Sequence, residues 1–265
     1  MKKTVSYSDL LLIRGEGFDV IENIKTLRQY GADSVELMMD GVYWDRMDER
    51  IEELSNTLAS LPMFFSIHPP AWDTNLTSEN KAIREATFLE YRKAIYFAHN
   101  ICAKYVVIHP GFVYCPVSDK RLAARRSRAA VYELNKIAGP LGVKLAVENV
   151  GSLENAIFNM DEYIDFLNGT DDNIGYLIDT GHAHLNGWDI ARLIEGTSKR
   201  LLALHLHDND GAGDQHLPLE TGKINWQPVY RVLKELVSDC QLVLEYKSGT
   251  PVEKLPEGKE LLKLK

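Results

Sequence analysis

The sequence has few cysteines and no long apolar segment. Its three cysteines, Cys102, Cys115 and Cys240, are far apart and form no CxxC pair, so a reducing cytosol is the simplest interpretation. The apolar run from Leu10 to Ile13 is too short for a signal-peptide core. No stretch of about 18 apolar residues occurs. We therefore expect a soluble, cytoplasmic protein with no membrane partner.

The chain also lacks an excess of positive charge and the common phosphate-binding loops. A net charge of −8 disfavours a nucleic-acid partner, because proteins that grip phosphate backbones usually carry a basic face. The basic run Arg125–Arg128 falls within a predicted helix, and we interpret it as a solvated surface. Neither GxGxxG nor GxxxxGK[ST] is present, which argues against an open doubly wound sheet. No organic cofactor is expected.

Short apolar runs alternate along the chain with longer helical patterns. The candidate strands are Thr4–Tyr7, Ser34–Leu37, Met63–His68, Tyr105–His109, Lys144–Glu148, Ile174–Asp179, Leu201–His205 and Gln241–Glu245. They are continuous apolar runs, as buried parallel strands should be. The first unit is the least regular, because Ser6–Phe18 follows no clear pattern. Eight strand–helix units without a linker predict an α/β fold, a single (β/α)₈ TIM barrel formed by residues 1–265.

The helical patterns have recognisable ends. They lie near Asp19–Tyr30, Arg46–Ser60, Glu79–Ala103, Ser118–Ala138, Asp161–Leu167, Asp189–Glu195, Trp226–Val237 and Pro256–Leu264. Ser118 and Asp161 are candidate N-caps, since their side chains can accept the free N–H groups of a first turn. Gly31 and Gly139 follow helices, where a left-handed residue is often needed.

Six consecutive predicted strands end in a histidine or an acid: His68, His109, Glu148, Asp179, His205 and Glu245. The strand ends of a TIM barrel form the rim that carries its active site, so these side chains should converge. Crowded carboxylates and histidines need a cation to neutralise them, and this mixture suits Zn²⁺, Mn²⁺ or a similar ion. Each residue alone has a structural explanation, such as Asp179 capping a helix. The coincidence at six strands favours a metal site.

Other candidates lie just beyond these strand ends. His182 follows Asp179 by three residues, and Asp208 and the Asp214-Gln215-His216 run come after His205. His205 and His207 share one strand face, so alternation cannot separate them, and we prefer His205 as the ligand. Glu36 either joins the site or accepts backbone N–H groups. Trp44, Trp72 and Trp226 can stack on a sugar, although such residues more often pack loops.

The motifs SIHPP, VVIHPG, AVENVG, IDTGHAH, LHLHDNDG with DQHLPLETGKINW, and LVLEY occur in the order seen in the xylose isomerase-like TIM barrel superfamily. That superfamily includes sugar-phosphate isomerases and epimerases and the endonuclease IV group. The resemblance spans roughly His68 to Glu245. It implies a four-ligand metal site of Glu148, Asp179, His205 and Glu245. Five further residues match the extra ligands of the endonuclease IV three-zinc cluster: His68, His109, His182, Asp214 and His216.

The resemblance implies a metal-dependent isomerase or epimerase of a small sugar, sugar acid or sugar phosphate. Glu148 and Glu245 would move protons through a cis-enediolate, with Mn, Zn, Mg or Co as the ion. The substrate-binding candidates are His182, His109, Lys247, Lys223 and Trp72. Two alternatives stay open. One is an endonuclease IV-like zinc-dependent phosphodiesterase, although its DNA-inserting loop motifs are not recognisable. The other is a non-catalytic sugar- or metal-binding barrel. For its quaternary structure, a homo-oligomer stays open alongside a monomer.

Overall fold

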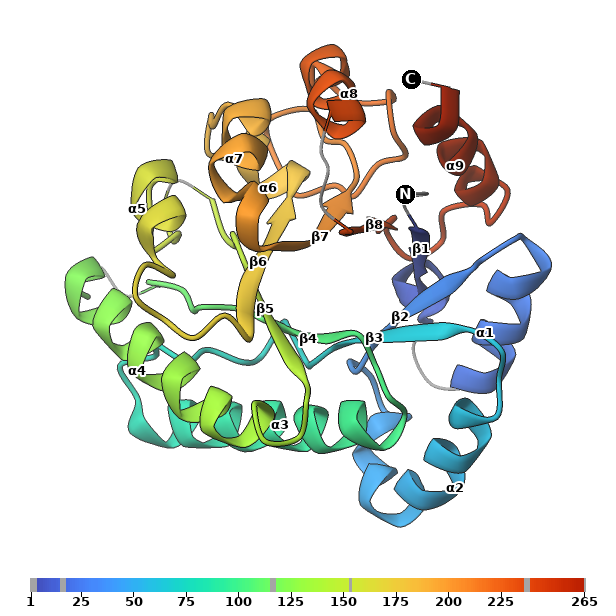
Figure 1. The fold of residues 1–265 in the computed structure, drawn as a ribbon, viewed down its shortest axis with the longest axis horizontal. Coiled ribbons are helices and arrows are strands. Elements are labelled where there is room, and N and C mark those ends of the chain that lie inside the picture. Colours follow the sequence, from blue (N-terminus) through green and yellow to red (C-terminus); the bar gives the residue numbers. More distant parts are fainter. Residues whose placement is uncertain (1–3, 15–17, 115–117, 153, 236–238, 265) are drawn as a thin grey trace.

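The computed structural model describes residues 4–14, 18–114, 118–152, 154–235 and 239–264. Its strands pair in chain order from β1 to β8, and β8 pairs with β1, which closes a parallel barrel. Helices surround the strands (Figure 1). The predicted (β/α)₈ barrel is therefore confirmed, whereas the assignment of residues 1–265 to one domain stays a prediction.

All eight predicted strands are present, and no end differs from its predicted position by more than one residue. The strands are β1 (Thr4–Ser8), β2 (Ser34–Met38), β3 (Phe64–His68), β4 (Tyr105–Ile108), β5 (Lys144–Glu148), β6 (Ile174–Asp179), β7 (Leu201–Leu206) and β8 (Gln241–Leu244). Every residue of β2, β4, β6 and β8 is buried. Helices cover the outside and side chains fill the inside, so both faces of a strand lie in apolar surroundings.

The helices that cover the barrel arise mostly where the sequence predicts them. They are α1 (Val20–Gln29), α2 (Met47–Ala59), α3 (Lys81–Asn100), α4 (Lys120–Ala138), α5 (Met160–Asp165), α6 (Thr180–Leu185), α7 (Ile190–Thr197), α8 (Trp226–Glu235) and α9 (Lys254–Leu264). Helix α6 is not among the helices predicted from hydrophobic patterns, because it begins directly after β6 and is too short to show a helical period. No helix within the described ranges is long and apolar enough to cross a membrane.

Two predicted helix caps are wrong by one or two residues. The cap of α4 is Asp119 rather than Ser118, and its carboxylate accepts hydrogen bonds from the first turn. The cap of α5 is Asn159 rather than Asp161, because Asn159 and Glu162 form a reciprocal capping box. Both true caps satisfy a free N–H group two or three residues ahead, as a cap must.

The turn after α4 also differs from its prediction. Gly31 has a φ of +88°, as expected after α1, but Gly139 has a φ of −57°. The left-handed residue after α4 is instead Gly142, with a φ of +71°. The chain therefore continues three residues beyond Gly139 before it turns toward β5.

The irregular first unit contains a buried acid at the rim. A 3₁₀ helix, Asp9–Leu12, follows β1. The Asp9 side chain is fully buried and accepts a hydrogen bond from the backbone N–H of Met38, 2.8 Å away at the end of β2. Burial raises the pKa of Asp9 to about 7. This carboxyl group ties the end of β1 to the end of β2.

Candidate metal centre

His205 lies among three carboxylates at the carboxyl-terminal rim of the barrel. Its Nδ1 atom is 3.2 Å from Glu245 Oε2, 3.5 Å from Glu148 Oε1 and 3.9 Å from Asp179 Oδ2. All four side chains are buried. They come from the ends of β5 and β6, from β7 and from the residue after β8. The four residues of the predicted single-ion site therefore form one cluster.

A second group lies at the ends of β3 and β4. His109 Nε2 is 3.0 Å from Glu148 Oε2, and His68 Nε2 is 3.7 Å from the same oxygen. The His68 Nδ1 atom is 2.8 Å from the carbonyl oxygen of Pro69. A proton on Nδ1 makes this contact a hydrogen bond, and Nε2 is then the nitrogen that faces Glu148. Both histidines thus lie close to Glu148, which also belongs to the first group.

A third group forms where α6 meets the loop after β7. Asp214 Oδ2 is 3.2 Å from His182 Nε2 and 3.1 Å from His216 Nε2. The other ring nitrogen of His182, Nδ1, is 3.4 Å from Glu148 Oε1. The structure therefore brings the nine residues of the two predicted ligand sets to one rim, with Glu148 in contact with each of the three groups. Asp208, by contrast, accepts hydrogen bonds from the backbone N–H of Ile224 and from Trp226 Nε1 and belongs to none of these groups.

Asp179 connects this rim to helix α6. Its Oδ1 atom accepts a hydrogen bond from the backbone N–H of His182 at 2.6 Å, which makes Asp179 the N-cap of α6. Its Oδ2 atom faces His205 and lies 2.8 Å from His207 Nε2. The two explanations that the sequence allowed for Asp179 are therefore compatible, because each uses a different carboxylate oxygen.

His207 occupies a different place from His205. It contacts Asp179 from the side, and its ring stacks on His216 with the centroids 3.9 Å apart. A side chain at Gly181 would overlap the His207 ring, so the glycine of the Asp-Thr-Gly-His motif makes room for this histidine. His205 thus faces the carboxylate cluster, whereas His207 supports Asp179 at its edge.

The ionisation of the cluster follows from its mixture of charges. Burial would raise the pKa of Glu148, but the charges of His205 and His109 hold it well below its usual range. Burial would lower the pKa of His205, but Glu245, Glu36 and Glu148 raise it well above its usual range. In the same way, contacts with Glu148 raise the pKa of His68 to about 9. Burial instead lowers the pKa of His109, so the imidazoles of the cluster differ in their tendency to carry a proton.

Several buried atoms of the cluster lack a well-formed hydrogen bond among the residues that the structure describes. They are Glu36 Oε1, Glu148 Oε2, His182 Nδ1, His207 Nδ1 and both ring nitrogens of His109 and His205. Buried polar atoms normally have partners, because desolvating them is costly. Sets of these side chains place ligand atoms within 4.8 Å of one another. Imidazole and carboxylate donors so arranged fit a divalent first-row ion.

Glu36 joins the cluster from below the rim. Its Oε1 atom is 2.7 Å from His205 Nε2. Its Oε2 atom accepts hydrogen bonds of 2.9 Å from both the Ser66 and the Tyr105 hydroxyl groups. Of the two roles that the sequence left open, Glu36 takes the first. Ser66 and Tyr105 were missed, although a charged residue inside the buried run SVELM was a signal that polar partners lie nearby.

A cavity of about 360 Å³ opens onto this rim. His68, His109, Glu148, His182, Asp214, His216 and Glu245 line it, together with Trp72, Phe112 and Tyr114. Trp72 and Tyr114 are 66% and 68% exposed, so both have free aromatic surface at the cavity. Phe112 and Tyr114, which the sequence analysis missed, follow β4 and stack on each other. Lys223 and Lys247 are exposed, and neither is among the residues that line the cavity.

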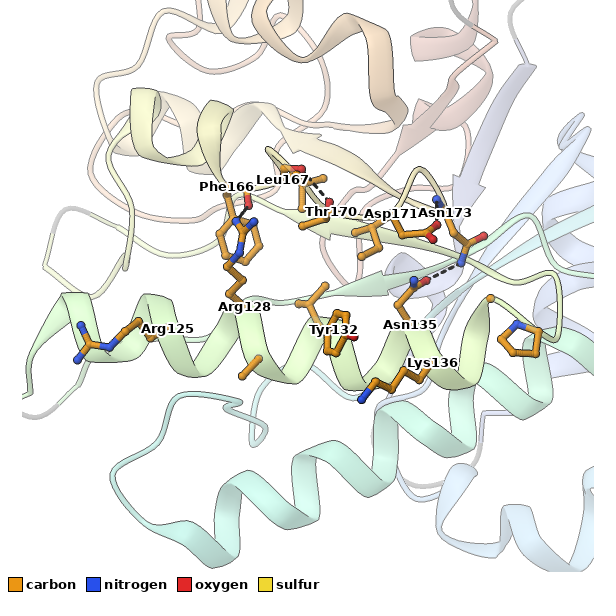
Figure 2. A pocket seen from close by; sticks show the side chains of 16 residues that line it. Arg125, Arg128, Tyr132, Asn135, Lys136, Phe166, Leu167, Thr170, Asp171 and Asn173 are labelled. Carbon is orange, nitrogen blue, oxygen red and sulfur yellow. Dashed lines mark hydrogen bonds between the residues drawn. The ribbon is translucent and has the colours of Figure 1, made fainter.

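A larger cavity, of about 910 Å³, lies on the outer helical ring and not at the rim. Figure 2 shows it between α4 and the segment that leads from α5 to β6. Arg128 lines it and donates hydrogen bonds to the carbonyl oxygens of Phe166 and Asn168. Arg126, in the same basic run, pairs with Glu79 at 3.0 Å. Arg125 and Arg128 are exposed, as expected for a solvated surface, and Arg126 and Arg128 also form structural contacts that the sequence did not reveal.

Comparisons with known proteins agree with this architecture. The family model described as xylose isomerase-like TIM barrel matches residues 24–265. An uncharacterized protein of Methanocaldococcus jannaschii is 30% identical over 253 residues, which cover 94% of each chain. A crystal structure of a D-tagatose 3-epimerase-like protein superposes with a TM-score of 0.85 at 24% identity and covers 98% of this chain and 96% of that one. The structural likeness shows the shared fold.

More distant relatives carry names from two functional classes. An inosose isomerase of Bacillus velezensis is 24% identical over 202 residues, covering 74% of this chain and 69% of that protein. A probable endonuclease 4 of Thermoplasma volcanium is 28% identical over 182 residues, covering 63% and 60%. Both functions suggested by the sequence motifs are thus represented among the relatives.

Proposed function

Because the chain belongs to the xylose isomerase-like TIM barrel family, we propose that it is a metal-dependent isomerase or epimerase of a small sugar. The observation that carries the proposal is the position of Glu148 and Glu245. Both carboxylates are buried, both approach the same atom of His205, and both line the rim cavity. Two carboxylates that reach one small cavity can exchange protons with a single substrate.

Glu148, Asp179, His205 and Glu245 would hold the divalent ion, which could be Mn, Zn, Mg or Co. When bound, such an ion supplies positive charge that stabilises negative charge developing on two neighbouring substrate oxygens. The additional candidates, His68, His109, His182, Asp214 and His216, would hold further ions or bind the substrate. These assignments rest on the distances within the cluster and on its buried atoms that lack a well-formed hydrogen bond among the described residues.

In the proposed reaction, one of Glu148 and Glu245 removes the proton from the carbon next to the substrate carbonyl. The cis-enediolate that results is protonated by the other glutamate, which enters the step as a carboxylic acid. Return of the proton to the opposite face of the same carbon gives epimerisation, and return to the neighbouring carbon gives isomerisation. His182 and His109, which line the cavity, would hold hydroxyl groups, and Trp72 would stack on the apolar face of the sugar.

The cavity lining favours an unphosphorylated substrate. Among the described residues that line it there is no lysine or arginine, and its charged groups are histidines and acids. A phosphate dianion would need fixed cations to replace its hydration. We therefore propose a neutral sugar or cyclitol rather than a sugar phosphate, and we assign no phosphate-binding role to Lys223 and Lys247.

The test is an assay of metal-loaded protein on matched pairs of free and phosphorylated ketoses, aldoses and inososes. We expect turnover of a free sugar, incorporation of solvent deuterium at the reacting carbon, and loss of both in Glu148→Gln. Turnover of the phosphorylated partner alone would reject the neutral substrate but keep the reaction type. Binding of sugars without deuterium exchange in any pair would indicate a non-catalytic barrel.

The endonuclease alternative is supported by the full set of matching ligand candidates, and it needs its own test. A nuclease must grip several phosphates, mostly with lysine and arginine. Here the densest basic run lies on α4, where Arg126 and Arg128 are already paired. We expect zinc-loaded protein to leave a duplex with one abasic site intact. Efficient nicking beside that site, lost in Glu148→Gln, would replace our proposal with the nuclease.

A further inference from the structure

We propose that Glu36 is a positioning residue that orients His205 for metal binding from the interior of the barrel. The inference rests on the metal site of the proposed function. Glu36 belongs to β2 and His205 to β7, two strands that are not neighbours in the barrel. Their side chains meet across its interior, where both are fully buried and Glu36 Oε1 lies 2.7 Å from His205 Nε2.

The two nitrogens of His205 face different surroundings. Nδ1 faces Glu148, Asp179 and Glu245 at the rim, whereas Nε2 faces Glu36 below it. An imidazole ligates a metal ion through one nitrogen, and a carboxylate at the other fixes the ring orientation and the position of its proton. With its proton on Nε2, the ring presents the Nδ1 lone pair to the three rim carboxylates. Glu36 therefore selects the nitrogen that can bind the ion.

The second oxygen of Glu36 is anchored independently. Ser66 on β3 and Tyr105 on β4 each donate a hydroxyl hydrogen bond of 2.9 Å to Oε2. Ser66, Tyr105 and Glu36 are all fully or almost fully buried. These two bonds hold the carboxylate in place and leave Oε1 without a well-formed hydrogen bond. Oε1 is instead directed at His205 Nε2, so the carboxylate connects β2 to the opposite side of the barrel.

Packing alone does not account for a carboxylate here. Burying an acid is costly because its charge loses hydration, and an apolar side chain of similar volume often stabilises a core as well or better. An acid at position 36 is therefore best explained by what it does to His205.

The experiment compares Glu36→Gln with the unchanged protein by competition for Zn²⁺ against a chromophoric chelator. Glutamine has the same shape but no charge. We expect the dissociation constant for the tightest ion to weaken by about 10- to 100-fold, with the number of ions bound at saturation unchanged. An unchanged dissociation constant would show a purely structural role. Loss of one whole equivalent of zinc would show that Glu36 is itself a ligand. Either result would overturn the proposal.

Further variants keep the test decisive. Asp9→Asn is the matched control, since Asp9 is a buried acid at the end of the neighbouring strand, and its zinc affinity should stay within about twofold of the unchanged protein. If Glu36→Gln does not fold, Ser66→Ala and Tyr105→Phe should each weaken zinc binding. Unchanged zinc binding in both variants would reject the proposal.

His205→Ala tests the underlying metal site. Undiminished affinity there would refute the metal site itself, whereas an effect in His205→Ala without one in Glu36→Gln would refute only the positioning role.

Discussion

The two sides of the barrel rim contribute differently to the metal cluster. Strands β3 to β8 each end in, or closely precede, a histidine or acid that faces the cluster. Strands β1 and β2 end in Ser8 and Met38, and their acids, Asp9 and Glu36, lie just beyond or just before the strand end. Asp9 bonds to the backbone of β2, and Glu36 contacts His205. One side thus presents candidate ligands, while the other supplies groups that hold the structure beneath them.

This difference shows that the type of residue does not define its role at the rim. All these acids are buried, but their neighbours differ. Glu148 and Glu245 are surrounded by histidines and reach the cavity, whereas Glu36 is enclosed by hydroxyl groups and one imidazole. The following predictions test this contrast.

The largest effect is expected at the proposed acid–base pair. Glu148→Gln and Glu245→Gln should each lower kcat by about 1,000-fold or more, because the amide cannot transfer the proton and binds the ion poorly. Steady-state assays on the free sugar, with circular dichroism to check folding, provide the measurement. Glu253→Gln, at an exposed site, is the control. Near-full activity in either variant would show that the two-carboxylate mechanism is wrong.

A smaller effect is expected when the metal contents of His205→Ala and His207→Ala are compared. His205→Ala is expected to lose most of its bound metal, because Nδ1 faces three carboxylates. His207→Ala should retain most of it, because His207 contacts only Asp179 within the proposed four-ligand set. Elemental analysis after dialysis against a weak chelator measures the difference. Full metal content in His205→Ala beside a depleted His207→Ala would reverse the assignment.

The next prediction concerns the cavity mouth. Trp72→Ala should raise KM by roughly three- to tenfold with little change in kcat, because aromatic stacking contributes about 0.5–1.5 kcal/mol and no proton transfer is assigned to this side chain. Trp72→Phe is the control and should restore most of the affinity. A selective fall in kcat would show that Trp72 acts on the reacting atoms rather than on binding.

The smallest effect is expected on the supporting side of the rim, at Asp9. Its pKa is raised to about 7 in the folded protein, so the folded state keeps a proton that the unfolded chain has already released. Stability should therefore fall as the pH rises from about 4 to 7 and level off above that, by an amount on the order of 2 kcal/mol between pH 5 and 8. In Asp9→Asn this decline should disappear. Thermal unfolding of both proteins at pH 5 and pH 8 provides the measurement. If the variant lost as much stability between these pH values as the unchanged protein, the prediction would be wrong.

Much of the fold could be predicted because its causes are local. Parallel strands buried on both faces appear as uninterrupted apolar runs, and each run ended within one residue of its predicted position. The short helix α6 could not be predicted in this way, since it depends on the Asp179 cap rather than on a repeating pattern. The caps of α4 and α5 were misplaced because neighbouring polar residues compete for the same position.

The sequence indicated which residues gather at the candidate site, but not how they are arranged in it. The strand ends revealed which residues could converge, although their roles stay predictions. The distinction between His205 and His207 depends on which of them reaches the three carboxylates, and the alternation of strand residues does not separate two positions that are two residues apart. The partner of Glu36 is far away in the sequence and across the barrel, so only the closed strand order brings the two together.

The overlap between Gly181 and His207 has a consequence for directed evolution. Any side chain at position 181 would collide with the His207 ring, so members of a saturation library at that position should lose the contact between His207 and Asp179 while keeping most of their metal, as His207→Ala should. The rim segments that carry Trp72 and Tyr114 offer the opposite situation, because their aromatic rings are mostly exposed. Variation that alters sugar preference should accumulate in the segments after β3 and β4. The contact between Gly181, after β6, and His207, after β7, should vary little.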